Sequence, residues 1–593
     1  MSISVSIVRS RVDGIVPLAV LFDATGTTST ATSRPFHDCY YVWDFGDTGS
    51  GNHPTITGMP TRSRNTAYGP VAAHVYENSG TYTVTLTVYD SDGTVDTATT
   101  TITATDWEEG VTGDTVVVAE DGDFTGAPSH DVEVDPSVAG LDFDGIINQY
   151  IATHKRILFK RGELYTANAK SSIDVTGPGI IGAWGSGAKP AITSSLDGIC
   201  IGLSSLATKN LTDWRIMDLS IDCSSGTASS CIDAEGEMSQ LLVYRVDMAN
   251  AHFFVRVNAS ILDETVDTMF DQIAVVDCTG TTGVGGQTGN GLFLWGSKLT
   301  VMGNVINPAG GVEHGTRIMY STPGVISRNV FTGGATSKTD FTFRAPDFAG
   351  GETLPAGSYN EYTVISENKF ISAFTSSTAV TGPNNSGTGE RIKDCIWENN
   401  WMIGSTVTTT LFGNQAYNDI TVRNNLFDLT NYPAFSRGVR INVTDAHDPE
   451  NMHYYNNTFS ATAGNSNMWV MDFNGGTGHR AYNNVAYIQD DTSAVMFQGV
   501  SGLNEDYATV NSTTTQVRET NPGVWSSYAV ATDFQLQSDA PYAIASGDNT
   551  PVLFDDFFRT ARDRANLDMG FHAYTTGTLP SIAATRKGSI GGL

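Results

Sequence analysis

Short segments in which apolar and polar residues alternate recur throughout residues 200–490, for example LTVMGN, YTVISEN and DITVRNN. About ten residues before each of them stands a second such segment, for example GLFLW, FTFRA or WVMDF. Alternation over four to eight residues is typical of a β-strand whose two faces differ in environment. No stretch of this region shows the 3.6-residue period of a long helix, so the pattern predicts a repeat made of strands and turns.

An asparagine followed two residues later by an apolar residue marks each repeat, as in RNNLF at 423–427 and YNNTF at 455–459. The series comprises Asn304, Asn329, Asn368, Asn400, Asn425, Asn457 and Asn484, and we extend it backwards through Asp218, Asp247 and Asp277. Repeats of this size indicate a solenoid whose coils stack about 4.8 Å apart. We expect each Asn to adopt the left-handed conformation at a tight corner and to bond its neighbours along the stack. The apolar residue two positions later should fill the interior.

Residues 3–104 form a separate unit. Alternation over 81–89 places Tyr82, Val84, Leu86 and Val88 on one face and threonines on the other, which predicts a half-buried antiparallel sheet in a small sandwich. WDFGDT at 43–48 and the strand pair from Tyr76 to Val88 resemble the PKD domain. The resemblance implies an immunoglobulin-like module that serves outside cells as a spacer, adhesive or docking unit. Asp90, Asp92 and Asp96 could bind Ca²⁺, but a hairpin turn explains them better.

The second domain begins after an acidic joint. RILFKRGELYTANAK at 156–170 and the Gly-rich passage that follows it resemble the first coils of right-handed parallel β-helix proteins, and segments 533–548 and 567–574 resemble their closing coils. We therefore predict an all-β chain with a PKD-like sandwich at 1–105, a linker at 106–114, a right-handed parallel β-helix at 115–575 and a tail at 576–593. This fold class includes pectate, alginate and chondroitin lyases, polygalacturonases and phage tailspikes, so the fold does not determine the activity.

The composition narrows the choice of partners. The 33 basic and 63 acidic residues give a net charge of −30, which disfavours nucleic acid and anionic membranes as partners. No apolar run is long enough to span a bilayer, and the first residues, MSISVSIVRSRVDG, lack the pattern of a secretion signal. The six cysteines show no metal-binding spacing, and we expect them to fill the interior as small apolar residues.

Two neighbouring coils carry an unusual set of charged residues. GGVEHGTRIMY contains Glu313, His314 and Arg317, and SKTDFTFRAP, about one coil later, contains Lys338, Asp340 and Arg344. In so acidic a chain this cationic patch suits β-elimination of a uronate. Arg317 and Arg344 would neutralise the sugar carboxylate, His314 or Lys338 would remove the proton, and Glu313 and Asp340 would contact substrate. The competing interpretation is a polar surface cluster without a catalytic role.

Hydrolysis is the competing chemistry. Arg391 and Lys393 match the RIK motif of polygalacturonases and would bind substrate, but the paired aspartates and the GHG motif of that family are absent. Asp267 and Asp271 could form a carboxylate pair, although solvated loop acids are the simpler interpretation. We expect no defined cofactor, with Ca²⁺ the ion to consider. Trp295, Trp401, Tyr417 and Tyr432 could stack on sugars, but core packing explains them better.

Three hypotheses follow for the function. The first is a phage spike at the virion surface that binds an anionic host surface glycan. A version of this hypothesis adds cleavage of the glycan. The spike's N-terminal domain would contact other virion proteins, and the spike would form a homotrimer without inserting into a membrane. The second is a secreted, extracellular polysaccharide lyase. The third is a non-catalytic adhesin or virion decoration protein.

Overall fold

The structure is a computed structural model of the 593-residue chain. It describes residues 2–498 and, beyond them, only 555–557 and 559. Within 2–498 the residues left undescribed are 91, 112–113, 195–197, 205–210, 225–229, 259–269, 283–288, 309–313, 334–338, 345–358, 373–376, 383–390, 406–409, 415–416, 430–436, 443–448, 462–468 and 489–494. The predicted closing segments and the predicted end of the solenoid at residue 575 therefore lie outside the described residues.

The N-terminal domain is a β-sandwich, as the sequence predicted. One sheet has the order β3 (Asp13–Ile15), β10 (Val95–Thr105), β9 (Gly80–Tyr89), β6 (Tyr40–Asp44), β7 (Thr66–Tyr68). The facing sheet has the order β2 (Val8–Arg9), β4 (Leu18–Asp23), β8 (Val71–Tyr76), and a short pair joins β1 (Ile3–Ser4) to β5 (Thr28–Ser29). Val84, Leu86 and Val88 of β9 are fully buried, and β9 and β10 form an antiparallel hairpin around residues 90–94. Helix α1 (Pro35–Asp38) precedes β6, and α2 (Trp107–Gly110) follows the sandwich.

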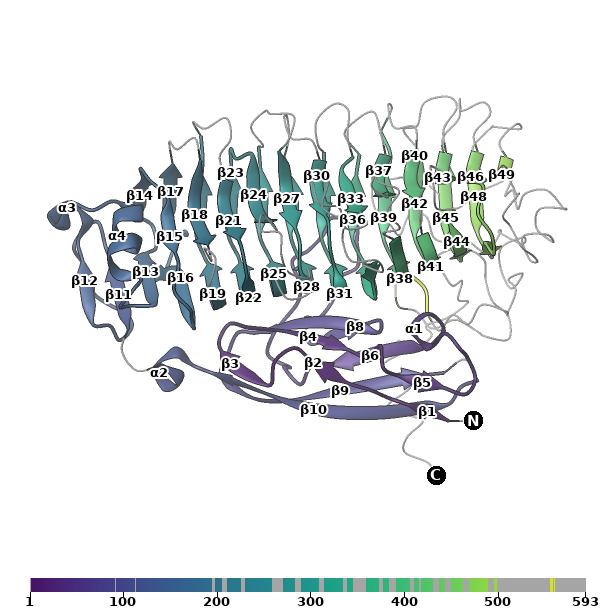
Figure 1. Cartoon of the computed structure of the whole chain (residues 1–593), viewed down its shortest axis with the longest axis horizontal. Helices are drawn as coiled ribbons and strands as arrows, with labels where there is room; N and C mark the ends of the chain where they lie inside the picture. Colours follow the sequence, from purple (N-terminus) through teal and green to yellow (C-terminus); the bar gives the residue numbers. More distant parts are fainter. Residues whose placement is uncertain are drawn as a thin grey trace.

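The rest of the described chain winds into a solenoid with three parallel sheets (Figure 1). The first sheet contains, in spatial order, β12 (Val132–Val134), β11 (Thr115–Val118), β13 (Arg156–Lys160), β16 (Gly179–Trp184), β19 (Leu211–Met217), β22 (Met238–Tyr244), β25 (Phe270–Val276), β28 (Ser297–Met302), β31 (Thr322–Ser327), β35 (Thr363–Ser366), β38 (Arg391–Glu398), β41 (Tyr417–Arg423), β44 (Glu450–Tyr455) and β47 (Arg480–Tyr482), and β34 (Tyr359–Glu361) also pairs with β38.

The second sheet contains β14 (Leu164–Ala167), β17 (Ala191–Ser194), β20 (Ser220–Asp222), β23 (Asp247–Ala249), β26 (Thr279–Thr281), β29 (Val305–Asn307), β32 (Val330–Thr332), β36 (Lys369–Ile371), β39 (Trp401–Ile403), β42 (Leu426–Leu429), β45 (Thr458–Ala461) and β48 (Val485–Ile488). The third sheet contains β15 (Ser171–Ile173), β18 (Ile199–Ser204), β21 (Ser230–Glu235), β24 (Phe253–Asn258), β27 (Asn290–Leu294), β30 (His314–Ile318), β33 (Phe341–Arg344), β37 (Ser377–Gly382), β40 (Thr410–Asn414), β43 (Arg437–Asn442), β46 (Trp469–Asn474) and β49 (Val495–Gln498).

Each coil contributes one strand to each sheet in turn, which is the parallel β-helix that the sequence predicted. Every strand returns to its own sheet after a crossover through the other two, and such crossovers are right-handed in nearly all proteins. The described coils agree with that winding. At the N-terminal end, α4 (Phe143–Tyr150), preceded by α3 (Pro136–Ala139), covers the open core with Phe143, Ile146 and Ile147. Among the described residues, no helix is long and apolar enough to cross a membrane.

The repeated asparagines form a ladder inside the corner between the first and second sheets. Nδ2 of Asn425 donates to Oδ1 of Asn457 at 3.0 Å, and Oδ1 of Asn425 accepts from Nδ2 of Asn400 at 3.0 Å. The same amide–amide bond links every neighbouring pair from Asn304 to Asn484. The predicted bonding along the stack is confirmed. Each amide also satisfies a buried backbone carbonyl, so the ladder stabilises the corner of every coil it crosses.

The apolar residues two positions after the ladder asparagines fill the interior, as predicted. These residues are Ile306, Phe331, Phe370, Met402, Phe427, Phe459 and Ala486, and none is more than 7% exposed. Phe427 and Phe459 stack with their ring centroids 4.6 Å apart. All six cysteines are buried and free, in agreement with their predicted role as fillers.

Two details of the predicted corner are wrong. The left-handed residue is not the ladder Asn but the one before it, with φ between 52° and 72° at Gly303, Arg328, Glu367, Asn399, Asn424, Asn456 and Asn483. The ladder Asn keeps an ordinary backbone because its amide must point inward to its neighbours. The backward extension is also displaced. Asp218 and Asp277 are left-handed corner residues, Asp247 opens β23, and the ladder position before Asn304 is Cys278, whose N–H donates to Oδ1 of Asn304.

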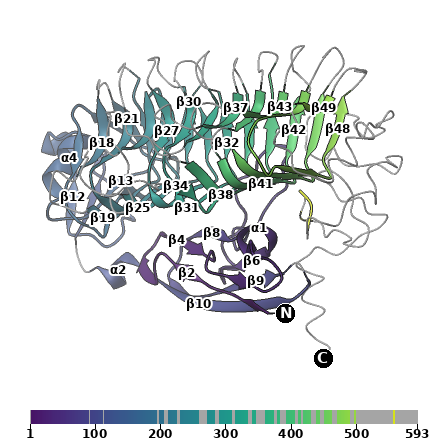
Figure 2. The same cartoon turned by 45° about the vertical axis from the view of Figure 1, so that its right-hand side comes forward.

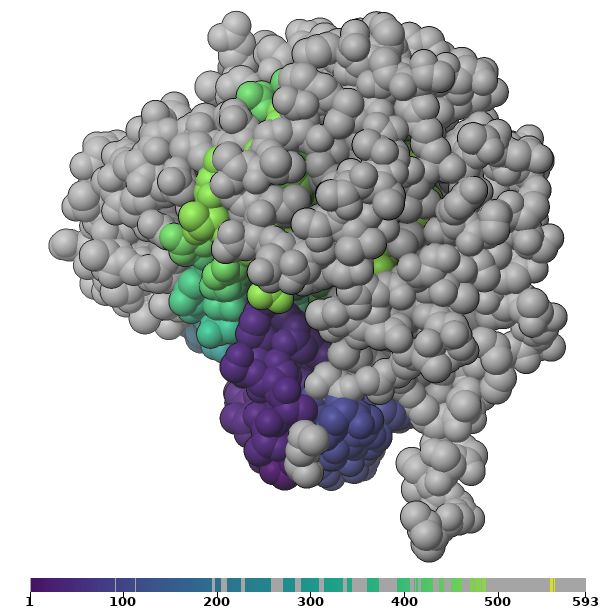
Figure 3. Space-filling view, turned by 90° about the vertical axis from the view of Figure 1, so that its right-hand side faces the viewer, coloured from purple at the N-terminus to yellow at the C-terminus, as the bar shows by residue number. Residues whose placement is uncertain are grey.

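The N-terminal domain lies along the first sheet of the solenoid (Figures 1 and 2). Val71 and Leu21 pack against Val325, Val364 and Ile396, which point outward from the first sheet. A second apolar contact places Val75 against a group that comprises Leu242, Tyr244, Ala274, Val276 and Met302. Figure 3 shows the same close contact from the side, with the purple sandwich directly against teal and green atoms of the solenoid. The sandwich is therefore docked onto the solenoid rather than held at a distance from it.

Candidate functional site

The third sheet turns its outer face away from the N-terminal domain (Figures 1 and 2). The strands on which the domain makes its larger contacts, such as β25, β28, β31, β35 and β38, all belong to the first sheet. A β-helix offers a long, rigid face on which strands stand about 4.8 Å apart. We define the third-sheet face by the outward residues of β21, β24, β27, β30, β43 and β46.

Register places several charged and aromatic residues of this face in one row. Asp233 pairs with Arg256, Arg256 with Phe293, Phe293 with Arg317, and Arg317 with Thr342. Further along the solenoid the same row contains Arg440, which pairs with Asp472. The row therefore aligns Arg256, Arg317 and Arg440 along the axis of the solenoid, with other residues at the positions between them.

Two of these arginines lie over phenylalanine rings. The guanidinium carbon of Arg256 is 5.3 Å from the ring centroid of Phe253, and that of Arg317 is 5.5 Å from that of Phe293. Such contacts hold a long side chain in place and leave its edge to bind ligands. Nε of Arg317 also donates to the sulfur of Met319 at 3.0 Å. The face therefore presents positioned guanidinium groups beside apolar rings.

Asp233 and Glu235 bind the first of these arginines. Nη2 of Arg256 lies 2.6 Å from Asp233 and 3.0 Å from Glu235. Asp233 is buried, and Oδ1 has no hydrogen-bond partner among the described residues. Burial raises the pKa of Asp233, although Arg256 opposes the shift. The sequence analysis missed Asp233, Glu235 and Arg256, because these coils lie before the asparagine ladder and their register was not visible.

The structure places His314 and Arg317 on one strand of this face. His314 is buried, and its Nδ1 lies 2.6 Å from the hydroxyl of Thr339 and 3.1 Å from that of Thr342. Arg317 is partly exposed on the outer face of β30. Asp340 is buried just before β33, where its carbonyl accepts the N–H of Thr316.

The structure describes only part of the remaining members of the predicted cluster. Glu313 and Lys338 lie outside the described residues. The backbone of Arg344 is described, and it lies two residues beyond Thr342, the partner of Arg317. The coil offset is therefore 25 residues at this point of the sheet, whereas Arg317 and Arg344 are 27 positions apart. Arg344 is a diagonal neighbour of Arg317 and not its direct partner.

Arg391 and Lys393 do not join this cluster. Both belong to β38 of the first sheet, which faces the N-terminal domain, whereas β30 and β33 belong to the third. Nζ of Lys393 lies 2.7 Å from Glu361 of the neighbouring strand β34. The predicted substrate-binding residues are thus divided between two faces of the solenoid.

The other predicted candidates have structural partners. Trp295 and Tyr417 are buried in the solenoid core, as the core-packing interpretation predicted. Trp401 is buried outside that core, in a small apolar cluster with Ile56 and Met59 of the N-terminal domain, and Tyr432 lies outside the described residues. Asp271 accepts from Lys298 at 2.6 Å and from Ser297 at 2.8 Å, and Asp267 is not described. The described residues contain no group of three or more His, Cys, Asp or Glu placed to hold a metal ion.

A cleft of about 770 Å³ opens at the N-terminal end of the solenoid. Its lining includes Arg156, Lys160, Arg161 and Trp184. Each cation already pairs with a carboxylate: Arg156 with Glu108, Lys160 with Asp121 and Arg161 with Asp218. The cleft lies at one end of the solenoid, whereas the third-sheet row extends over several coils, so we take the third-sheet face as the candidate site for an extended ligand.

The architecture is that of an immunoglobulin-like sandwich docked on a parallel β-helix. Residues 22–103 match the model of the PKD domain family. No curated protein matches the chain.

Among solved structures, the chain is similar to a family 28 exopolygalacturonase from Yersinia enterocolitica (11% identity, 85% of this chain and 99% of the other, TM-score 0.46). It is also similar to the A-module of the Azotobacter vinelandii mannuronan C-5 epimerase AlgE6 (11%, 61% and 94%, 0.42). A third similar structure is the tailspike protein of E. coli bacteriophage HK620 (8%, 60% and 75%, 0.38). Because one fold hosts many activities, the function has to be argued from the site itself.

Proposed function

We propose that the protein binds an anionic polysaccharide along the third-sheet face. The observation that carries this proposal is the in-register row that contains Arg256, Phe293, Arg317 and, further along, Arg440. Guanidinium groups bind carboxylates with two parallel hydrogen bonds, and aromatic rings suit the apolar faces of sugars. Arg440 lies four strands beyond Arg317, which at 4.8 Å a strand is about 19 Å. An extended polymer can reach both residues, whereas a small ligand cannot.

Binding measurements with alginate, pectin and host capsule test this proposal. Arg317→Ala should weaken binding about tenfold to a hundredfold, because a hydrogen bond to a charged group contributes about 1.5–3 kcal/mol. Arg440→Ala should weaken the binding of long polysaccharide chains and leave the binding of the shortest fragments unchanged. Lys189→Ala is the matched control, since Lys189 pairs with Asp247 beside the second sheet. Equal affinity of all three variants would refute a binding site on this face.

Cleavage by β-elimination is the second candidate function. It is supported by the neighbouring placement of His314 and Arg317 on β30, with Arg344 diagonal to them on β33. Arg317 would neutralise the uronate carboxylate, and His314 or Lys338 would remove the proton. The assay is the absorbance of unsaturated uronate after incubation with each polymer. A non-catalytic adhesin that binds its partner elsewhere would give no signal, and its binding would survive Arg317→Ala combined with Lys338→Ala.

The biological setting that we propose is the surface of a phage virion. The sandwich would contact other virion proteins through its five-stranded sheet, and the solenoid would bind a host surface glycan as a homotrimer. An extracellular polysaccharide lyase is the alternative. Capsid and tail genes beside the coding sequence would support the first, and polysaccharide-utilisation genes the second.

A further inference from the structure

The corner between the first and second sheets carries a row of side chains that face outward. Four consecutive members of this row are the left-handed residues Arg328, Glu367, Asn399 and Asn424, each just before a ladder asparagine. A non-glycine residue in this conformation is strained, and such strain persists only where the surroundings fix it. All four are buried, so something covers them. Two other parts of the chain do so.

The first part is a loop of the N-terminal domain. Nε of Arg62 donates to Glu367 at 2.9 Å, and the carbonyl of Pro60 accepts from Arg328 at 3.0 Å. Beside them, Lys369 is 8% exposed and donates to the carbonyl of Thr57 at 2.7 Å. The loop therefore covers the beginning of the row.

The second part is a short C-terminal segment made of Asp555, Asp556, Phe557 and Arg559, which we name the strap. Nδ2 of Asn424 donates to the carbonyl of Asp555, and Nδ2 of Asn399 donates to the carbonyl of Asp556, both at 3.1 Å. Successive corner residues thus bind successive residues of the strap. In both of these coils the first amide of the Asn pair binds the strap, and the second joins the ladder.

The strap also contacts the N-terminal domain. The hydroxyl of Tyr40 donates to Asp555 at 2.5 Å, and Arg62 donates to the carbonyl of Phe557 at 3.1 Å. The Arg559 guanidinium lies 3.9 Å from the ring centroid of Tyr68. Phe557 is buried in a small apolar cluster that comprises Ile56 and Met59 of the domain and Trp401 and Leu426 of the solenoid.

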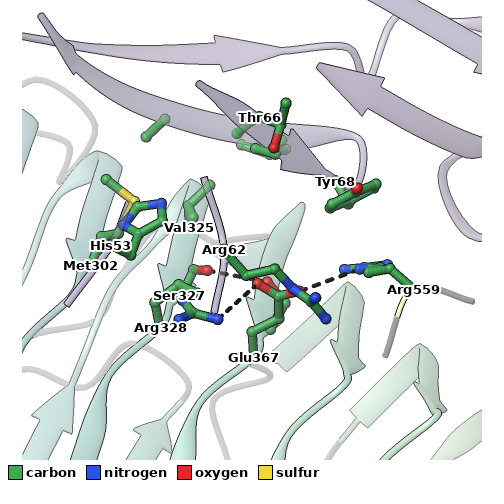
Figure 4. A pocket seen from close by; sticks show the side chains of 15 residues that line it. His53, Arg62, Thr66, Tyr68, Met302, Val325, Ser327, Arg328, Glu367 and Arg559 are labelled. Carbon is green, nitrogen blue, oxygen red and sulfur yellow. Dashed lines mark hydrogen bonds and ion pairs between the residues drawn. The ribbon is translucent and has the colours of Figure 1, made fainter. Parts of the chain in front are cut away.

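Glu367 joins the three parts electrostatically (Figure 4). Arg62 comes from the domain, Arg328 from the corner row and Arg559 from the strap, at 2.9, 3.6 and 3.3 Å from the Glu367 carboxylate. Burial alone would raise the pKa of Glu367, but the three guanidinium groups outweigh it and hold the pKa well below its usual range. Removing the strap would take away one of the three cations and uncover the apolar cluster.

We propose that the strap locks the N-terminal domain onto the solenoid, so that docking of the domain depends on the C-terminal part of the chain. Pulling the strap away would release the domain loop that contains Ile56 and Arg62 and would expose the small apolar cluster around Phe557, while the contacts of Val71 and Val75 with the first sheet would remain. This inference is independent of the proposed glycan binding.

Acylation of lysines in the full-length protein, read by mass spectrometry, tests the lock. Lys369 is 8% exposed and contacts the carbonyl of Thr57 and the ring of Trp401, whereas Lys298 is 36% exposed and serves as the internal reference. In Arg559→Gln, and in the double variant Asn399→Gly with Asn424→Gly, the labelling rate of Lys369 should rise at least tenfold while that of Lys298 stays constant. Glycine suits the left-handed backbone, so the double variant removes the two amides without adding strain.

The matched control is Asn451→Gly, a left-handed position with φ 53° whose exposed side chain binds Asp419. It should leave Lys369 protected. Unchanged labelling of Lys369 in both strap variants would overturn the proposal. A rise in the labelling of Lys298 as well would also overturn it, because the strap would then stabilise the solenoid and not the docking.

Discussion

Replacing Asn425 by Ala tests the asparagine ladder. The substitution removes five hydrogen bonds: two accepted from Asn400, and one donated to each of the Trp397 carbonyl, the Arg423 carbonyl and Oδ1 of Asn457. A buried hydrogen bond contributes about 1 kcal/mol net, and several of these share a donor or acceptor, so we expect a loss of about 3–5 kcal/mol. The N–H of Asn400 is left without its acceptor inside the solenoid.

The assay is urea unfolding followed by circular dichroism, with the free energy of unfolding compared between variants. Asn304→Ala, at the ladder's first position, removes three hydrogen bonds of the same kind and should lower the free energy of unfolding by proportionately less. Asn52→Ala, at an exposed residue of the N-terminal domain, should change stability by no more than about 0.5 kcal/mol. If Asn425→Ala and Asn52→Ala were equally stable, the ladder would not stabilise the solenoid, and the reasoning would be refuted.

Further predictions concern the docked domain and the thiols. Glu367→Gln should weaken docking by about 3–5 kcal/mol, because it removes the carboxylate that three guanidinium groups share, of which Arg559 keeps Asp555 and Glu398; protection of Lys369 that survives the change would contradict this. Burial and Arg34 lower the pKa of both His37 and His453 at the interface, that of His453 to about 2. When the domain undocks, both histidines bind protons more readily, so docking should weaken as the pH falls below about 6.5. The ratio of Lys369 labelling to Lys298 labelling should therefore rise between pH 7.5 and 5, and a constant ratio would contradict the prediction. A thiol reagent should find no reactive cysteine in the native protein and six after denaturation, since all six are free and buried; fewer than six would indicate a disulfide.

The docked domain changes how the chain should be viewed. The resemblance to the PKD domain implied a spacer, adhesive or docking unit, and here apolar contacts and buried ion pairs hold the module along the first sheet. Arg215 shows how closely the two parts fit, because it is buried and donates to the carbonyls of Ile15 and Pro17. The third-sheet face is turned away from the docked domain.

The sequence alone determined the two folds and the ladder. Alternation and the Asn repeat are local signals with a fixed period, and stacking of coils follows from that period once strands are recognised. The interior position of Phe427 and the bonding of Asn425 to its neighbours could therefore be predicted from spacing. The left-handed conformation of Asn424 was assigned to the wrong residue of the pair, because both tolerate it and only the tertiary structure shows which amide points inward.

Only the tertiary structure decided which faces remain open and which side chains meet on them. Arg256 and Arg317 align because two coils of different length share one register, and the distance between them in the chain does not reveal this. Lys393 lies on the first sheet and Arg317 on the third, and the sequence did not show which sheet each strand joins. The meeting of Arg62, Glu367 and Arg559 joins residues hundreds of positions apart, and no local pattern encodes such a contact, because it arises from the complementary surfaces of two finished folds.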